Sequence, residues 1–512
     1  MTLYDLIEQG AQLHRNRPAV IFEESVTSYA ALRQQTDRIA ASLQEVGIHK
    51  GDKVAVWLPN NNLFIPVYLG ITAIGAVMVP MNTRYRTHEV SYILNDADVA
   101  AIVMVSRFLK TDYQEILREA LLGTPAVQHI IMTDSEEGSL PSVSWRAFLD
   151  AGSDRLPATT GVTDDDVAQI LYTSGTTGNP KGVMLTHRNV CTNARVTGEV
   201  MAVTAEDRYF VPLPLFHSFG LVLGCLTPLI FGSSIVLQEV FEPQQALTLM
   251  ERHCCTMNFG VPTMFMMELE ELRKNPYTLS LRSGMMGGAP CPIEVVRGAR
   301  EEMGCNVLIG YGITETAPLI SLTRYSDSDV KRAESVGLPL PGVEVKVVND
   351  QRQEVPAGDI GEIASRGNTM NGYYKMPEAT SEVLDRDGWY YSGDLGKVDR
   401  EGYLYITGRK KDMIVVGGFN VYPRELEEVL FNYPGVKNAA VVGVPDKRLG
   451  EVIKAYLISD GTVTADEIQD FCRGQMANYK VPTYVAFVDT FPMTASGKVQ
   501  KYKLREHHDT SL

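Results

Sequence analysis

The sequence predicts an α/β protein: a large N-terminal domain of layered α/β subdomains with a β-rich subdomain, then a small C-terminal α+β domain. First, short apolar runs alternate with longer helical stretches, which is typical of helices packed on largely parallel sheets. Second, after Val336 the residues alternate between apolar and polar, with turn signals between the runs. Third, a charged run at 409–412 precedes about 100 residues, an ordinary domain size. We therefore expect domains at 1–409 and 410–512.

The elements follow in chain order. The large domain has two clear helical stretches, at 29–46 and 243–253. Its predicted strands are 54–58, 100–104, 129–132, 234–237 and 306–309. The β-rich subdomain is predicted from strands at 343–347 and 361–363. The small domain is predicted from a helix at 423–431, a strand at 439–444 and a helix at 465–473.

Two uncharged runs, 63–82 and 209–238, are long enough to resemble membrane spans. Both are interrupted by Gly and Pro. We interpret the first as a buried helix leading into a strand at 76–80, and the second as loop, buried helix and strand.

Bulk properties restrict the function. The hydrophobic content of 45% is that of a packed globular protein, and the net charge of −15 argues against a nucleic-acid or anionic-membrane binder. An anionic ligand would then need local basic groups, for which the candidates are Lys181, Arg409, Lys410, Lys411, Lys498, Lys501, Lys503 and Arg505. The seven cysteines are scattered without a Cys-x-x-Cys pair, and the N-terminus lacks a signal pattern, so we expect a cytoplasmic protein.

The most informative stretch is 172–182, Tyr-Thr-Ser-Gly-Thr-Thr-Gly-Asn-Pro-Lys-Gly. Apolar runs at 168–171 and 183–185 flank it, so it is predicted to be a loop between two strands. Its glycines allow close approach of a ligand, its hydroxyls are donors, and Lys181 supplies a charge. The spacing is not that of a Walker A loop, since Lys181 is followed by Gly182. We predict that the loop binds polyphosphate in another manner.

Further motifs follow in a fixed order. They are Pro214-Leu215-Phe216-His217-Ser218-Phe219-Gly220, Gly287-Gly288-Ala289-Pro290, Tyr311-Gly312-Ile313-Thr314-Glu315-Thr316, Tyr391-Ser392-Gly393-Asp394, Gly408-Arg409-Lys410-Lys411-Asp412, Gly417-Gly418-Phe419-Asn420-Val421-Tyr422-Pro423 and Pro492-Met493-Thr494-Ala495-Ser496-Gly497-Lys498. Together with the loop they resemble the adenylate-forming superfamily: acyl-CoA synthetases, peptide-synthetase adenylation domains and beetle luciferases. The resemblance covers residues 28–503 and is to the acyl-CoA synthetase branch.

The resemblance implies an ATP-dependent acid–thiol ligase. A carboxylic acid is converted to acyl-AMP with release of pyrophosphate, and CoA then takes the acyl group. ATP and CoA are the implied co-substrates and Mg²⁺ the implied cofactor, because phosphate charge must be neutralised.

By the same resemblance, each motif has a role. Thr314 contacts the α-phosphate and Glu315 is the Mg²⁺ ligand. Asp394 and Arg409 hold the ribose. The implied nucleotide-binding residues are also Thr173, Ser174, Gly175, Thr176, Thr177, Lys181, Gly288, Ala289, Pro290, Tyr311 and Gly312, with Tyr311 stacked on adenine.

The remaining implied roles concern catalysis and movement. Lys498 is implied to bridge the carboxylate and the α-phosphate, and His217 to stand beside the acyl carbonyl. The small domain is implied to be mobile, swinging about Lys411, with Gly417 and Gly418 lining the thiol path. We consider two further partners: a second copy of the chain, which would give a homodimer, and an acetyltransferase that acts on Lys498.

The acid itself is predicted to be apolar. Segments 261–267 and 285–286 are rich in methionine, which adapts to flexible apolar ligands. Medium- or long-chain fatty acids are favoured and aryl acids come second, while Arg282 leaves a dicarboxylate open. A stand-alone adenylation enzyme that loads a carrier protein, and a non-catalytic nucleotide-binding relative, are the alternatives. Amino-acid activation is disfavoured, because 216–220 holds no carboxylate.

Overall fold

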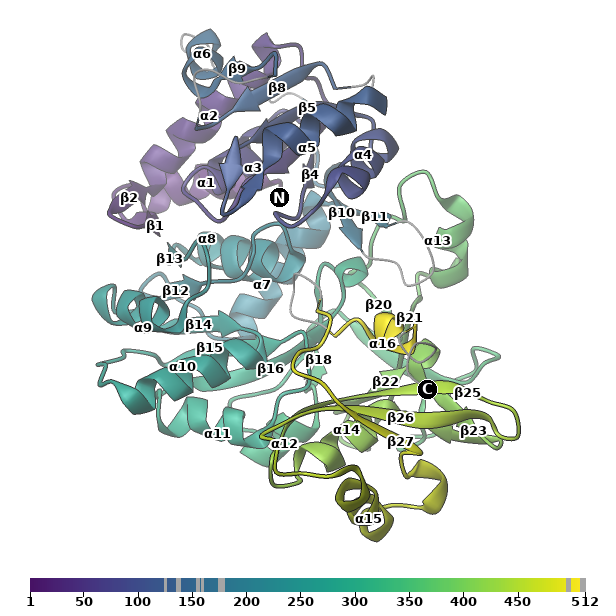
Figure 1. Cartoon of the computed structure of the whole chain (residues 1–512). Coiled ribbons are helices and arrows are strands. Elements are labelled where there is room, and N and C mark those ends of the chain that lie inside the picture. The colour runs from purple at the N-terminus through teal and green to yellow at the C-terminus, as the bar shows by residue number, and fades with distance from the viewer. Residues whose placement is uncertain are drawn as a thin grey trace. The chain divides into compact units, whose positions relative to one another are not determined.

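The computed structural model describes residues 1–123, 127–134, 140–152, 157, 161–173, 180–493 and 499–506. The chain forms two compact units (Figure 1). Unit 1 consists of Met1–Glu344 and Arg366–Tyr390, and unit 2 of Val345–Ser365 and Tyr391–Leu512.

In the described part of unit 1, one sheet has seven strands in the order β11-β10-β4-β3-β5-β8-β9. Every neighbouring pair is parallel except β10–β11, which forms an antiparallel hairpin. The strands are β3 (Lys53–Trp57), β4 (Val77–Pro80), β5 (Val99–Met104), β8 (His129–Met132), β9 (Val143–Ser144), β10 (Val167–Thr173) and β11 (Lys181–Thr186). A separate short hairpin joins β6 (Arg107–Phe108) to β7 (Thr111–Asp112).

The second sheet of unit 1 has nine strands within the described residues, in the order β18-β17-β16-β15-β14-β12-β13-β1-β2. Its six central strands are parallel, and antiparallel strands close both edges. They are β1 (Pro18–Phe22), β2 (Ser25–Ser28), β12 (Arg208–Val211), β13 (Ser234–Leu237), β14 (Met257–Gly260), β15 (Ser283–Gly287), β16 (Asn306–Gly312), β17 (Leu319–Leu322) and β18 (Leu338–Pro339). The parallel core expected from the alternating pattern is therefore confirmed.

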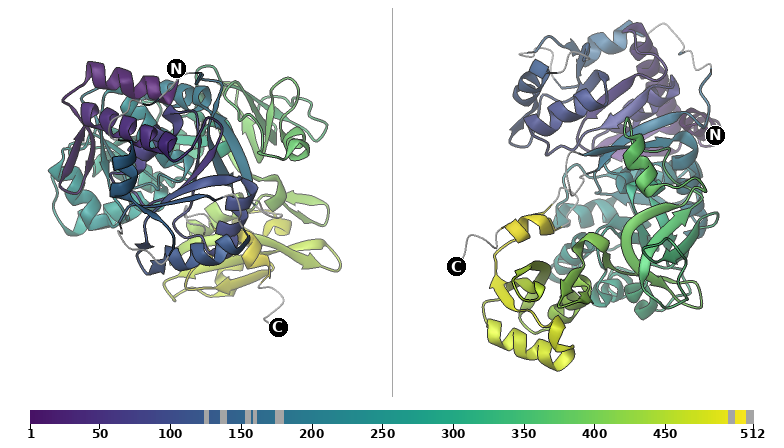
Figure 2. Two further views of the ribbon diagram at one scale, coloured as in Figure 1. Left: turned by 90° about the horizontal axis from the view of Figure 1, so that it is seen from above. Right: turned by 90° about the vertical axis from the view of Figure 1, so that its right-hand side faces the viewer.

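Helices cover these sheets, and α1, α2 and α3 pack against one another (Figures 1 and 2). Several begin at side-chain caps: Thr2 accepts from the Asp5 N–H, and Ser28 accepts from the Ala31 N–H. The helices of unit 1 are α1 (Leu3–Leu13), α2 (Tyr29–Glu45), α3 (Phe64–Ala73), α4 (Thr87–Asp96), α5 (Tyr113–Ala120), α6 (Trp145–Ala151), α7 (His187–Val200), α8 (Thr227–Phe231), α9 (Pro243–Arg252), α10 (Pro262–Lys274), α11 (Ile293–Glu301), α12 (Asp329–Glu334) and α13 (Pro377–Val383).

Both uncharged runs are buried in unit 1. All of α3 is buried, and β4 follows it as predicted. The second run contains β12, then a helix that is π-wound over Phe219–Leu226, then α8 and β13. An apolar run carries no period that distinguishes π from α winding, so the sequence predicted only a helix there. The search of the described residues finds no helix long and apolar enough to cross a membrane.

Unit 2 holds two sheets within its described residues. One has the order β19-β20-β21-β22, and the other has β24-β23-β26-β25 with β27 paired to β26. The strands are β19 (Glu344–Val348), β20 (Gly361–Arg366), β21 (Tyr390–Val398), β22 (Leu404–Arg409), β23 (Ile414–Val416), β24 (Phe419–Val421), β25 (Val436–Asp446), β26 (Gly450–Ser459) and β27 (Tyr484–Phe487). The helices are α14 (Pro423–Phe431), α15 (Ala465–Gln475) and α16 (Lys501–Glu506). The β-rich subdomain and the α+β domain expected from the sequence are both present.

Candidate functional site

The hairpin β10–β11 carries the predicted phosphate-binding loop at its end. Thr173 is the last residue of β10 and Lys181 the first of β11, and the two residues are paired in the register of the hairpin. The Thr173 hydroxyl donates to the Lys181 carbonyl at 3.5 Å. The loop residues Ser174, Gly175, Thr176 and Thr177 lie outside the described residues.

Lys181 and Glu315 are connected through Tyr373, which the sequence reasoning did not single out. The Lys181 ammonium lies 5.0 Å from the centre of the Tyr373 ring, within range of a cation–π contact. The Tyr373 hydroxyl donates to Oε1 of Glu315 at 2.9 Å. Burial, and then the charge of Glu315, raise the pKa of Tyr373, so its hydroxyl stays protonated as a donor. The three side chains form one polar group, which we call the Lys181–Tyr373–Glu315 row.

The backbone explains how Tyr373 reaches this place. Residues 370–374 run along β11: Tyr373 forms an isolated bridge with Val183, and the Tyr374 N–H donates to the Gly182 carbonyl at 2.8 Å. The Met370 N–H donates to the Glu315 carbonyl at 2.7 Å. Tyr373 lies far from both partners along the chain, so only the tertiary pairing with β11 could reveal it.

Three predicted motifs meet at the carboxyl ends of β15 and β16. Gly287, which ends β15, pairs with Gly310 in β16, and a Cβ at Gly287 would lie 3.8 Å from the Phe219 ring. Gly288, Ala289 and Pro290 continue from β15 on the surface, and Gly288 has a φ of +82°, which favours glycine. In parallel α/β sheets this edge is where ligands bind.

Tyr311 and Gly312 end β16, and Thr314 and Glu315 lie in the short 3₁₀ turn that follows. A Cβ at Gly312 would lie 1.8 Å from the Pro318 carbonyl oxygen, so only glycine fits there. Tyr311, Thr314 and Glu315 are all half-buried, so part of each residue stays exposed.

His217 lies in the turn between β12 and the π-wound helix. Its Nδ1 accepts from the Phe219 N–H at 3.3 Å, so the neutral ring carries its proton on Nε2. The Gly220 backbone packs so closely that a Cβ there would be 2.4 Å from the Pro214 carbonyl oxygen. This fixes the turn, and with it the histidine.

The methionine-rich segments divide between surface, core and candidate pocket. Val261 and Met264 are half-buried at the start of α10, and a Cβ at Gly288 would lie 3.6 Å from Val261. Met286 is fully buried and packs in a core cluster with Phe265, while Met267 is 45% exposed. Only Val261 and Met264 therefore remain candidates for the acyl pocket among these five.

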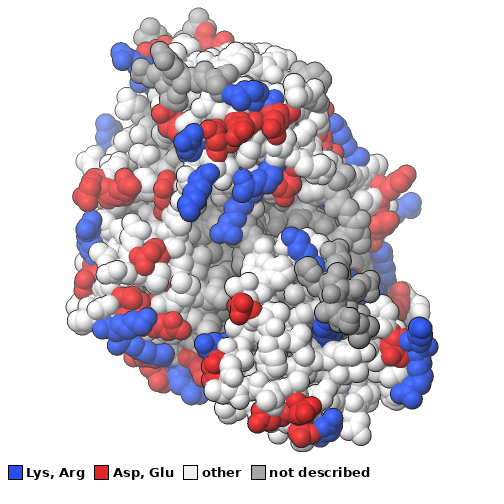
Figure 3. Space-filling view, in the orientation of Figure 1, with Lys and Arg blue, Asp and Glu red and all other residues white. Residues whose placement is uncertain are grey.

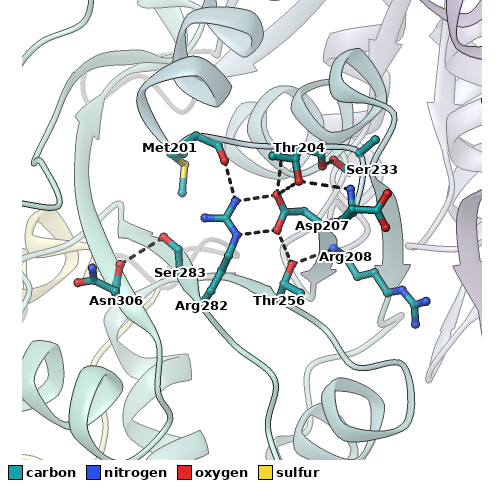
Figure 4. A network of polar contacts seen from close by, with 12 residues as sticks. Met201, Thr204, Asp207, Arg208, Ser233, Thr256, Arg282, Ser283 and Asn306 are labelled. Atoms are coloured by element: carbon teal, nitrogen blue, oxygen red, sulfur yellow. Dashed lines mark hydrogen bonds and ion pairs between the residues drawn. The ribbon is translucent and has the colours of Figure 1, made fainter. Parts of the chain in front are cut away.

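Arg282 does not serve as a partner for a dicarboxylate. Its guanidinium donates to both carboxylate oxygens of Asp207, at 2.7 and 2.6 Å (Figure 4). Asp207 also accepts from the Thr256 hydroxyl at 2.7 Å and the Thr204 N–H at 2.8 Å. Burial acts to raise the pKa of Asp207, but these bonds hold it below its usual range. Arg282 precedes β15, whereas Gly288 follows it, so the two residues lie at opposite ends of that strand. Arg282 therefore gives no support for a dicarboxylate substrate.

Unit 2 contains the remaining described site residues. Asp394 in β21 pairs in register with Arg409 in β22, and Arg409 Nε lies 3.1 Å from Asp394 Oδ1. Asp394 is buried and Arg409 exposed, so the aspartate is oriented by its partner. Lys411 lies two residues further on, in the turn Lys410–Asp412, and is exposed.

Gly417 and Gly418 form the two-residue turn of the hairpin β23–β24, in which Val416 pairs with Phe419. Their φ angles of +56° and +88° are both positive, as a type I′ turn requires. Lys498 lies outside the described residues. The roles given to all these residues by the sequence stay predictions.

The described residues contain no group of three or more His, Cys, Asp or Glu that could hold a metal ion. Figure 3 shows acidic and basic side chains interspersed over one face of the molecule. That an anionic ligand is bound by local basic groups stays a prediction.

Comparison with known proteins bears on the whole chain. The family model described as AMP-binding enzyme matches residues 7–374, and that of the AMP-binding enzyme C-terminal domain matches 425–498. The Bacillus subtilis (strain 168) protein YngI, whose name assigns it provisionally to the acyl-CoA synthetases, is 41% identical over 99% of this chain and 96% of its own. The medium-chain fatty-acid–CoA ligase of Escherichia coli (strain K12) is 35% identical over 99% of this chain and 90% of its own.

The fold matches solved structures as well. The crystal structure of ATP-bound MatB from Rhodopseudomonas palustris superposes with a TM-score of 0.88, at 32% identity, covering 100% of this chain and 99% of that one.

Proposed function

The chain belongs to the AMP-binding enzyme family, as an AMP-forming acyl-CoA synthetase, and from this premise we propose that it activates a medium- to long-chain fatty acid. The observation that carries the proposal is the Lys181–Tyr373–Glu315 row, in which Glu315 lies in the 3₁₀ turn after β16, together with Val261 beside Gly288 after the neighbouring strand β15. The first group suits a nucleotide polyphosphate. Val261 and Met264 suit an alkyl chain. ATP and CoA are the co-substrates of this family.

In the first half-reaction the acid's carboxylate oxygen attacks the α-phosphorus of ATP. The bond from that phosphorus to the bridging oxygen breaks, and pyrophosphate leaves. In our proposal Lys181 and Thr173 hold the polyphosphate, Thr314 contacts the α-phosphate, and Tyr311 stacks on adenine beside Gly312 and the segment 288–290. No protein nucleophile is needed, so positioning and charge compensation carry the step.

Glu315 is proposed to bind Mg²⁺. The fit rests on the donor present: the half-buried carboxylate of Glu315, oriented by the Tyr373 hydroxyl. Mg²⁺ is commonly held by one or two carboxylates together with substrate phosphates and water, which matches such a site. The ion would neutralise phosphate charge as pyrophosphate leaves.

The residues of unit 2 complete the proposal. Asp394 and Arg409 bind the ribose hydroxyls, and Lys498 stabilises charge that develops between carboxylate and α-phosphate. In the second half-reaction the thiol of CoA attacks the acyl carbonyl beside His217, and AMP leaves. We propose that domain 410–512 turns about Lys411 between the steps and brings Gly417 and Gly418 to the thiol path.

Three further proposals concern context. All seven cysteines are free, and all but Cys254 are buried, which supports work in a reducing compartment such as the cytoplasm. Acetylation of Lys498 would remove its charge and switch off the first step. A homodimer stays an expectation.

The test is a panel of acids assayed for ATP- and CoA-dependent pyrophosphate release. We expect saturated acids of medium length to give the highest kcat/KM, with aryl acids at least tenfold lower, since they fill a flexible alkyl pocket poorly. Release of ADP and orthophosphate would overturn the reaction type. A preference for benzoates would refute the proposed fatty-acid substrate, and a preference for a carrier-protein thiol would refute CoA as the acceptor. In both cases the adenylation reaction itself would stand.

A further inference from the structure

Helix α4 contacts the chain on both sides of the phosphate-binding loop, at Tyr172 in β10 and at Pro180 directly before β11. It places Tyr92 and Asp96 four residues apart, so both side chains lie on one face. The buried residues Val90, Ile93 and Leu94 fix the helix in the core. Figure 1 shows α4 in the part of unit 1 that carries β10 and β11.

The first contact is to β10. The Tyr172 hydroxyl donates to Asp96 Oδ2 at 2.5 Å, and Tyr172 is the residue directly before Thr173. Burial, and then Asp96, raise the pKa of Tyr172 far above its ordinary value, so the phenol remains a donor at neutral pH. A short bond to a carboxylate is among the stronger hydrogen bonds.

The second contact is to the other end of the loop. The Tyr92 hydroxyl donates to the Pro180 carbonyl oxygen at 3.1 Å, directly before Lys181. The Tyr92 ring meets the Tyr172 ring edge to face, with centroids 6.4 Å apart and an interplanar angle of 89°. One helix therefore holds the residue before Thr173 and the residue before Lys181.

Gly182 provides the space for this arrangement. A Cβ at Gly182 would lie 3.1 Å from Tyr172 Cζ and 2.8 Å from the Ile170 side chain. Glycine beside the lysine thus lets the Tyr172 ring lie flat across the hairpin and reach Asp96.

We propose that Tyr92, Asp96 and Tyr172 are positioning residues for the first half-reaction: they fix Thr173 and Lys181 so that the hairpin binds the polyphosphate of ATP. The proposal rests on the proposed function of the hairpin. The three side chains act through the backbone at the two ends of the loop. Tyr92 and Asp96 are absent from the motifs that carry the resemblance, and Tyr172, the first residue of the loop motif, was given no role by it.

The test compares Tyr172→Phe, Tyr92→Phe and the double variant with the parent. The matched control is Tyr374→Phe, which removes the Tyr374–Asp98 hydrogen bond of 3.1 Å in the same region but leaves the backbone bond of Tyr374 to Gly182 in place. Asp96→Asn keeps an acceptor oxygen for Tyr172, and Asp96→Leu removes it. Each variant is measured for KM of ATP, KM of the acid, ATP affinity by calorimetry, and thermal unfolding.

We expect Tyr172→Phe and Asp96→Leu to raise KM and Kd for ATP about tenfold, as for loss of one hydrogen bond to a charged group. Tyr92→Phe should raise them about threefold, KM for the acid should stay within twofold, and Asp96→Asn should recover part of the loss. Tyr374→Phe should bind ATP like the parent. Unchanged ATP affinity in Tyr172→Phe and Asp96→Leu would overturn the proposal.

A Lys181→Ala variant separates this proposal from the proposed function. If Lys181→Ala loses ATP affinity while the tyrosine variants do not, the hairpin binds phosphate and the positioning by α4 is wrong. If Lys181→Ala binds ATP normally, the hairpin's function fails, and the proposal fails with it. A third outcome would also overturn the proposal. If all variants, Tyr374→Phe included, lose ATP binding and acid binding equally and unfold at a lower temperature, these side chains only stabilise the fold.

Discussion

The Tyr373 hydroxyl donates a 2.9 Å hydrogen bond to Glu315 Oε1, so a residue outside every predicted motif orients the proposed metal ligand. The same ring lies 5.0 Å from the Lys181 ammonium. Tyr373 is buried, and its backbone pairs with Val183 in β11. One side chain thereby sets the distance between the proposed phosphate-binding lysine and the proposed metal-binding carboxylate.

Substitution of Tyr373 should therefore separate two effects. Tyr373→Phe keeps the ring near Lys181 and removes the bond to Glu315, so the half-saturating Mg²⁺ concentration should rise about tenfold. Tyr373→Leu also removes the cation–π contact, so the KM for ATP should rise as well. Mg²⁺ titrations of pyrophosphate release, with Mn²⁺ binding followed by spin resonance, measure both. A Tyr373→Phe variant with the parent's metal affinity would show that the bond does not orient Glu315.

Glu268 is a buried carboxyl whose protonation should affect stability. Asn258 Nδ2 donates to its Oε2 at 2.7 Å, while Glu268 Oε1 and Asn258 Oδ1 are both buried without a hydrogen-bond partner among the described residues. A proton on Oε1 would remove the buried negative charge and turn that oxygen into a donor, next to a side chain whose own buried oxygen lacks one. Burial, offset in part by the bond from Asn258, raises the pKa of Glu268 from 4.5 to about 8.

The sign of the pH effect follows from this shift. Between pH 4.5 and about 8 the folded protein holds a proton on Glu268 that the unfolded chain has released, so this contribution to stability is full below pH 4.5 and is lost as the pH rises to about 8. Glu268→Gln replaces the proton by an N–H donor and should flatten the decline of Tm between about pH 5 and 8. Parallel Tm–pH curves for the two proteins would refute a neutral Glu268.

The turn at Gly417–Gly418 gives a test of the thiol path. Gly418 has a φ of +88°, so Gly418→Leu would strain the turn as well as add a side chain. Gly418→Asn tolerates the left-handed conformation, and a Cβ there would meet no described atom within 4 Å. We expect Gly418→Asn to keep ATP–pyrophosphate exchange and to slow acyl-CoA formation from acyl-AMP about tenfold. Equal rates in both assays would place the thiol elsewhere.

Lys498 should act on charge that develops only in the transition state of the first step. Lys498→Ala should lower the adenylation rate by about 10²–10³, as for loss of one preorganised donor, with little change in ATP affinity. Supplied with acyl-AMP and CoA, the variant should form acyl-CoA at nearly the parent rate. Equal loss of both steps would mean that Lys498 serves both or supports the fold.

The sequence predicted elements better than it predicted contacts. Helix 29–46 and strand 234–237 are found within one residue, because periodicity and caps are local. The loop hairpin was also predictable, since turn residues separated two apolar runs. Tyr373, Asp96 and Arg282 were not, because their roles depend on partners that lie far away in the sequence: Glu315, Tyr172 and Asp207.

In the proposed first half-reaction the acid's carboxylate attacks the α-phosphorus of ATP. The decisive experiment for this step uses decanoic acid labelled with ¹⁸O in the carboxyl group, with mass analysis of the AMP formed in the presence of CoA. Attack by the carboxylate oxygen, followed by cleavage of the acyl carbon–oxygen bond, predicts one ¹⁸O in each AMP and none in pyrophosphate. Unlabelled AMP, or label in orthophosphate, would contradict it.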